Sequence, residues 1–108
     1  MPDYPVARFD ALRDGDGRVV RPAGVEVALF RVGDRVFALG NTCLHTGAAL
    51  GEGFVIDGCA VCPWHGWRYD LQSGRRLPPV GDLGVETFAV RVEDGSVVVT
   101  IPDRAVGG

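Results

Sequence analysis

Two short segments of the chain carry side chains that bind metals. Cys43 and His45 form a C-x-H pair, and Cys62 and His65 form a C-x-x-H pair after sixteen intervening residues. Both histidines of the chain and two of its three cysteines fall into this pattern. Thiolates and imidazoles are protein ligands of zinc and of some iron-sulfur clusters. Each segment can therefore supply one thiolate and one imidazole to a metal centre.

These ligands fit a binuclear iron-sulfur cluster, in which each of two tetrahedral irons takes two protein ligands. With both cysteines on one iron and both histidines on the other, neutral imidazoles replace two thiolates, and the cluster becomes easier to reduce. The alternative is a zinc site with two cysteines and two histidines, which could include Cys59 because Cys59 and Cys62 form a C-x-x-C pair. Otherwise Cys59 is expected to be a small buried residue in a strand.

The elements that position these residues are expected to be β-strands. The 108 residues are 46% apolar and 23% charged, which is typical of one folded domain, residues 1–108. Sixteen glycines favour short strands and tight turns over long helices. The pattern predicts a first strand at 4–9, a solvated turn at 14–17, a hairpin at 25–39 and a second hairpin at 86–101.

The segment between the two hairpins has a different character. From Asn41 to Pro79 the alternation of apolar and polar residues stops, and this segment holds every cysteine, histidine and tryptophan. We therefore expect a cluster-binding subdomain at about 41–79, inserted into a β base formed by residues 4–40 and 80–102.

The charge distribution excludes several classes of partner. The net charge is -3, from 14 acidic residues against 11 arginines and no lysine, so no basic stripe is present to bind nucleic acid. The first residues lack a basic start and an apolar run, and no stretch approaches the roughly 20 apolar residues that cross a bilayer. We expect no membrane partner and a cytoplasmic protein.

The sequences around the four ligands resemble the two cluster-binding boxes of the Rieske family. These are residues 43–53, CLHTGAALGEG, and residues 62–70, CPWHGWRYD. The resemblance implies a [2Fe-2S] cluster with Cys43 and Cys62 on one iron and His45 and His65 on the other. It also implies an all-β fold, an antiparallel β-sandwich with an inserted cluster-binding subdomain. Pro78-Pro79 falls where the family has a proline-containing loop over the cluster.

The chain departs from the branch of the family found in respiratory and photosynthetic cytochrome complexes. That branch has an extra disulfide-bonded cysteine in each box, where this chain has Ala48 and Trp64. It also has a serine where this chain has Trp67, although Tyr69 matches its tyrosine. Fewer hydrogen bonds to the sulfurs predict a reduction potential near the low end of the Rieske range, roughly -150 mV. Trp64 could dock a partner or pack the subdomain, and Trp67 is expected to pack.

The resemblance implies a one-electron carrier that catalyses nothing by itself and passes electrons from a flavin reductase to a terminal oxygenase. Rieske oxygenases also carry a mononuclear iron, held by two histidines and a carboxylate, and this chain has no histidine left for such a site. Two alternatives remain at this point. One is the small subunit of an NADH-dependent nitrite reductase, and the other is a structural zinc module with an interaction role.

Overall fold

The computed structural model describes residues 2–42, 47–64, 66–79 and 83–102. These residues contain no α-helix and no helix long and apolar enough to cross a membrane. They form ten β-strands and three short 3-10 helices, which follow one another as β1 (Asp3–Arg8), η1 (Phe9–Ala11), β2 (Gly17–Val20), η2 (Pro22–Gly24), β3 (Val27–Val32), β4 (Arg35–Gly40), η3 (Leu50–Glu52), β5 (Phe54–Ile56), β6 (Cys59–Val61), β7 (Arg68–Asp70), β8 (Arg76–Leu77), β9 (Thr87–Glu93) and β10 (Ser96–Thr100).

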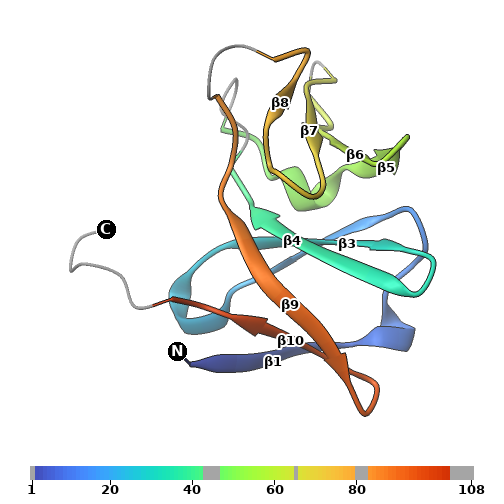
Figure 1. The fold of residues 1–108 in the computed structure, drawn as a ribbon, viewed down its shortest axis with the longest axis vertical. Helices are drawn as coiled ribbons and strands as arrows, with labels where there is room; N and C mark the ends of the chain where they lie inside the picture. The colour runs from blue at the N-terminus through green and yellow to red at the C-terminus, as the bar shows by residue number, and fades with distance from the viewer. Residues whose placement is uncertain (1, 43–46, 65, 80–82, 103–108) are drawn as a thin grey trace.

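The strands form two antiparallel sheets. The larger sheet has six strands in the order β1-β10-β9-β4-β3-β2, and the smaller has four in the order β5-β6-β7-β8. Figure 1 shows the smaller sheet at one end of the molecule, above the base formed by the larger sheet. The predicted all-β, antiparallel architecture is confirmed. The smaller sheet is built from residues of the segment that holds the metal-binding pattern.

Both predicted hairpins are present. β3 pairs with β4 from Val27 opposite Gly40 to Val32 opposite Arg35, around a turn in which Gly33 has a positive φ of 62°. β9 pairs with β10 across the turn at 94–95. The strand predicted at 4–9 is β1. β2 was not predicted, because its sequence GRVV is too short to show an alternating pattern.

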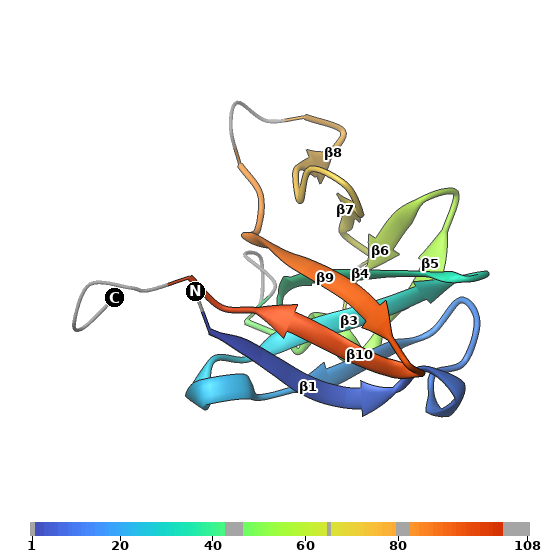
Figure 2. The same ribbon diagram turned by 60° about the horizontal axis from the view of Figure 1, so that its bottom comes forward.

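β3 is buried on both of its faces. The four residues Val27, Ala28, Leu29 and Phe30 have no exposed surface. Val27 and Leu29 pack into the core inside the base, where β9 and β10 lie across β3 and β4 (Figure 2). Ala28 and Phe30 face the opposite way and pack into a second core under the smaller sheet. This double burial explains why the sequence is continuously apolar here instead of alternating.

The turn at 14–17 holds the two sheets together, which differs from the solvated turn predicted from sequence. The Gly15 carbonyl accepts a hydrogen bond of 2.8 Å from the Val55 amide of β5, and the Gly17 amide donates one of 3.2 Å to the Gly53 carbonyl. A Cβ at Gly17 would lie 2.7 Å from Phe30 Cε1. This close approach requires glycine.

We expect Phe30→Ala to lower the free energy of unfolding by about 3–5 kcal/mol, because it leaves a cavity in the core that joins the two sheets. The matched control is Phe54→Ala on β5, where the ring is 42% exposed and the loss should stay below about 1 kcal/mol. The measurement is the urea midpoint of the cluster-loaded protein by circular dichroism after a fixed equilibration time. Equal midpoints for the two variants would contradict the role given to Phe30.

Candidate metal centre

Three of the four predicted ligands, Cys43, His45 and His65, lie outside the described residues, and the fourth is described. Cys62 directly follows β6 and is 1% exposed. It belongs to an apolar cluster with Leu50 and Tyr69, and Ala48 and Trp67 pack against that cluster. Leu50 and Ala48 follow the first metal-binding segment, and Trp67 follows the second. The structure therefore brings the flanks of both segments together.

Hydrogen bonds close the loop that contains the first segment. The Leu50 amide donates to the Asn41 carbonyl at 2.6 Å, and the Gly51 amide donates to Asn41 Oδ1 at 2.8 Å. Thr42 and Ala49 form an isolated antiparallel bridge between these contacts and the segment. Asn41 is 4% exposed, and its two acceptors fix where the chain leaves β4 and where η3 begins. The ends of the first loop are thus pinned by backbone amides.

The loop of the second segment is closed in a similar way. The Cys62 amide donates to the Trp67 carbonyl at 2.8 Å, directly beyond the last β6–β7 pair, Val61 opposite Arg68. Gly66 has a φ of 70°, which side chains rarely adopt. The six residues 62–67 therefore connect β6 to β7 as a tight loop with fixed ends.

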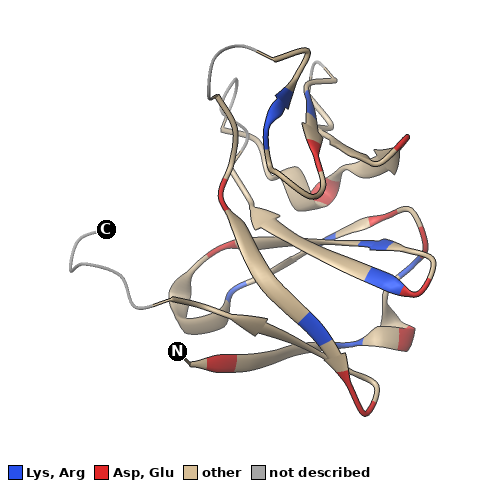
Figure 3. Ribbon diagram, in the orientation of Figure 1, with Lys and Arg blue, Asp and Glu red and all other residues tan. Residues whose placement is uncertain are grey.

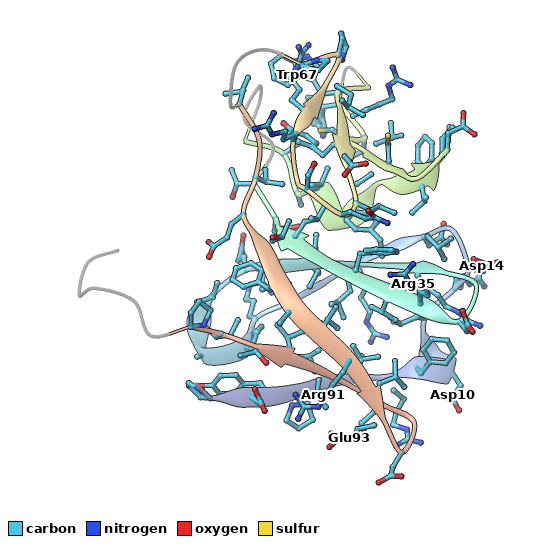
Figure 4. The ribbon with its side chains drawn as sticks, in the orientation of Figure 1. Asp10, Asp14, Arg35, Trp67, Arg91 and Glu93 are labelled. Atoms are coloured by element: carbon cyan, nitrogen blue, oxygen red, sulfur yellow. The ribbon has the colours of Figure 1, made fainter. Side chains whose placement is uncertain are left out.

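A third loop connects β8 to β9, and Arg76 of β8 contacts both this loop and the second. The Arg76 amide donates to the Leu83 carbonyl at 2.9 Å, and Pro78 and Pro79 between them are exposed. The guanidinium of Arg76 lies over the Trp67 ring, with Cζ 3.8 Å from its centroid, and Nη1 donates to the Pro78 carbonyl at 3.3 Å. Arg76 thus links the second and third loops at the end of the molecule marked by Trp67 in Figure 4.

Cys59 is separated from the Cys62 thiol by the alternation of β6. It lies in the strand, is 6% exposed and does not belong to the apolar cluster that contains Cys62. Burial raises the pKa of its thiol, Asp70 and Asp57 act in the same direction, and Arg68 opposes them. The thiol is free. These observations confirm the prediction of a small buried residue in a strand.

The glycines of the two boxes have different tasks. Gly47 and Gly66 have φ angles of 73° and 70°, and a Cβ at either position would meet nothing within 4 Å, so these positions need glycine for backbone conformation. Gly51 instead packs against the base, since a Cβ there would lie 2.7 Å from Val19 Cγ2.

The two tryptophans also differ. Trp67 packs against the apolar cluster, as predicted. Trp64 is 60% exposed, so it does not pack the subdomain. Sequence reasoning missed Asn41 and Arg76. An asparagine two residues before a C-x-H pair was the available signal for Asn41, whereas nothing local in the sequence pairs Arg76 with Trp67.

The described residues fit a bound cluster. Burial of a thiolate away from any cation costs free energy, and a bound iron offsets that cost. The Cys62 thiol, at a position that is 1% exposed, therefore fits a metal ligand. The loops on either side are short, closed by backbone hydrogen bonds and bordered by glycines in conformations that leave open space beside them. The chemistry of the donor set, two thiols and two imidazoles, suits a [2Fe-2S] cluster with mixed ligands.

Comparisons with known proteins agree with this geometry. The ferredoxin subunit of anthranilate 1,2-dioxygenase from Burkholderia cepacia is 35% identical over 100 residues, covering 91% of each chain. The structure of the ferredoxin of carbazole 1,9a-dioxygenase from Nocardioides aromaticivorans matches with a TM-score of 0.82 and 32% identity, over 92% of this chain and 97% of that one. A putative NADH-dependent nitrite reductase small subunit from Mycobacterium tuberculosis matches with a TM-score of 0.86 and 28% identity, over 95% and 97%.

The family model of the Rieske [2Fe-2S] domain matches residues 3–89, which include both metal-binding segments, both hairpin strands of β3 and β4 and the whole smaller sheet. The chain therefore belongs to the Rieske [2Fe-2S] domain family, and its cofactor is a [2Fe-2S] cluster.

Proposed function

We propose that the protein is a free ferredoxin that carries one electron at a time from a flavin reductase to a terminal oxygenase in the cytoplasm. The observation that carries this proposal is the match over nearly the whole of both chains to a dioxygenase ferredoxin subunit. The chain has no histidine beyond the two in the metal-binding pattern, so a mononuclear iron site with two histidine ligands must lie in a partner.

The ligand assignment is part of the same proposal. Cys43 and Cys62 bind one iron, and His45 and His65 bind the other. The burial of Cys62 and the closed ends of the two loops support this assignment. When bound, the cluster accepts and releases one electron without making or breaking bonds to a substrate. The chain holds the ligands in two short loops, and Leu50, Tyr69 and Trp67 keep water from the side that faces the core.

A second role is favoured by one observation. The nitrite reductase small subunit matches the fold with the TM-score of 0.86 given above. A chain in that role would stay bound to a large subunit instead of moving between partners. Purification from the native cells distinguishes the two roles, since a free carrier elutes at its own mass of 11.5 kDa or a small multiple of it. The family match leaves no support for the structural zinc module.

The first prediction is spectroscopic. The purified protein should be red-brown, and after dithionite reduction its paramagnetic resonance spectrum should have an average g value below that of all-cysteine clusters. Its reduction potential should be roughly -150 mV, near the low end for mixed histidine and cysteine ligation. A clearly positive potential would contradict the role as a donor to oxygenases, and a colourless protein with one zinc would contradict the cluster.

The second prediction concerns the closure of the first loop. Asn41→Ala removes the acceptor of the buried Gly51 amide, which should cost about 1–3 kcal/mol. Because the loop carries two proposed ligands, the variant should lose its visible absorbance several times faster than the unmodified protein in the presence of a chelator. Gln72→Ala, which removes an exposed amide at the β7–β8 turn, is the control and should lose the cluster at the unmodified rate. Equal rates for Asn41→Ala and the control would refute this role.

The third prediction separates Cys59 from the ligands. Cys59→Ala should keep the full cluster content and the same spectrum, whereas Cys43→Ser should lose the mixed-ligand spectrum. Burial and the raised pKa of the Cys59 thiol should also make it react with iodoacetamide at pH 8 much more slowly than a free cysteine does. Iron content, absorbance and mass spectrometry of the alkylated protein provide the measurements. Loss of iron in Cys59→Ala would overturn the proposed ligand set.

A further inference from the structure

We propose that the protein docks on a carboxylate-lined surface of its electron-accepting partner through Arg68 and Arg76, which lie next to Trp67 in the loop that also carries the exposed Trp64. This inference rests on the electron-transfer function proposed above and specifies the chemistry of the partner's surface. The net charge of -3 by itself predicts the opposite, an affinity for a basic surface. The local arrangement of charges is therefore the feature that decides between them.

The described charges nearest the second loop are positive. Arg68 is exposed, begins β7 and directly follows Trp67. Arg76 begins β8, and its guanidinium reaches back over the Trp67 ring. Figure 3 shows blue along β8, where Arg75 directly precedes Arg76, and at one end of β7. Asp70 lies at the other end of β7, where its Oδ2 accepts a hydrogen bond of 2.8 Å from the Ser73 amide.

The acidic groups close to this end lie on a different side. Glu26 and Glu86 line a cavity of about 430 Å³ at the base of the first loop, beside Asn41 and Thr42. Glu26 is already paired with Arg21 at 3.1 Å. Asp57 lies at the β5–β6 turn, at the opposite end of β6 from the 62–67 loop. Among the described residues, the cations Arg68 and Arg76 thus lie next to the second loop, whereas Glu86 lies where the third loop enters β9. Asp82, also in the third loop, lies outside the described residues.

Arg68 and Arg76 form no ion pair with a described carboxylate. The ion pairs within the described residues belong to the base, where Arg91 bonds Asp3 at 3.1 Å and Glu93 at 2.7 Å. Arg76 is instead fixed by the Trp67 ring and the Pro78 carbonyl, and its buried Nε has no hydrogen-bond partner within the described part of the chain. A guanidinium held in place loses little entropy when a carboxylate binds it.

Exposed apolar groups complete this surface. Trp64 is 60% exposed, Leu83 is 38% exposed, and Pro78 and Pro79 are exposed between them in sequence. Tryptophan and arginine are the residues that most often dominate the binding energy of protein interfaces. At physiological ionic strength charges are screened beyond about 8 Å. A partner in contact with the 62–67 loop therefore experiences Arg68, which directly follows that loop, and Arg76, which lies over its Trp67, more strongly than the acidic base.

The test uses two small one-electron oxidants of opposite charge, the trianion tris(oxalato)cobaltate(III) and the trication hexaammineruthenium(III). Each takes one electron from the reduced protein, freed of excess dithionite, so that cobalt(III) becomes cobalt(II) and ruthenium(III) becomes ruthenium(II). We expect the trianion to react more slowly as salt is added. Arg68→Gln should lower its rate roughly tenfold at low ionic strength, which is the effect of removing one charge about 8 Å from a trivalent reagent, and should raise the rate of the trication.

A change in driving force cannot make Arg68→Gln react more slowly with the trianion. Removal of a positive charge near the cluster lowers its reduction potential and therefore favours oxidation by both reagents. A slower reaction with the trianion must then come from weaker attraction, and redox titration of each variant measures the correction.

The matched control is Arg35→Gln. Arg35 also lies over an aromatic ring, with Cζ 5.1 Å from the Phe37 centroid, but at the β3–β4 turn, far from Trp67 in Figure 4. This variant should behave as the unmodified protein. Arg76→Gln is expected to act as Arg68→Gln does, and Arg68→Gln alone decides the test if the other variant loses its cluster.

A second measurement does not depend on electron transfer. The two tryptophans both lie in the 62–67 loop, so the ratio of iodide to caesium quenching of their fluorescence should exceed that of free N-acetyltryptophanamide, and Arg68→Gln should lower that ratio. If salt accelerates the trianion, or if Arg68→Gln and Arg35→Gln give the same rates and the same quenching, the cationic surface is refuted. That outcome leaves the electron-carrier role intact, because the role is tested separately by the spectrum and the potential.

Discussion

The burial of β3 on both faces is the constraint on which the rest of the structure depends. Val27 and Leu29 hold the base together, and Ala28 and Phe30 form the floor on which the smaller sheet packs. A strand in this position must be apolar at every residue, which the sequence VALF satisfies. Because the same strand belongs to both cores, displacement of the smaller sheet would expose apolar surface in a molecule of this size, where little surplus stability exists. The smaller sheet is therefore a fixed platform for the loops.

The loops on that platform are positioned mainly by backbone hydrogen bonds. The Asn41 carbonyl receives the Leu50 amide, and the Trp67 carbonyl receives the Cys62 amide. One side chain adds to this arrangement, since Asn41 Oδ1 satisfies the Gly51 amide. A loop fixed in this way needs few side chains of its own and leaves its remaining positions for ligands. A site that changes oxidation state without changing its bonds benefits from such rigidity, because less reorganisation accompanies each electron.

Features encoded by neighbouring residues could be predicted from the sequence, and features that depend on distant contacts could not. The hairpins follow from apolar patterns around glycine-containing turns. The ligand set read from the spacing of cysteines and histidines stays a prediction, because three of the four residues lie outside the described part of the chain. The turn at 14–17 looks solvated in sequence, but its amide and carbonyl groups bind β5 and Gly53, about forty residues away. The contact of Arg76 with Trp67 likewise depends on how β7 and β8 pair. The roles of Gly47 and Gly51 could be separated only when the neighbours of each were known.

The distribution of charge shows why net charge is a poor guide to the partner of a small carrier. An acidic chain can present a basic contact surface if its carboxylates are engaged elsewhere, and in the base Asp3 and Glu93 share Arg91 while Glu26 holds Arg21. An electron crosses only when the two redox centres approach closely, and at that separation screening removes most of the contribution from charges on the far side. Orientation is then governed by the few charges around the loops, so that Arg68 and Arg76 have more influence on the choice of partner than the fourteen acidic residues of the whole chain.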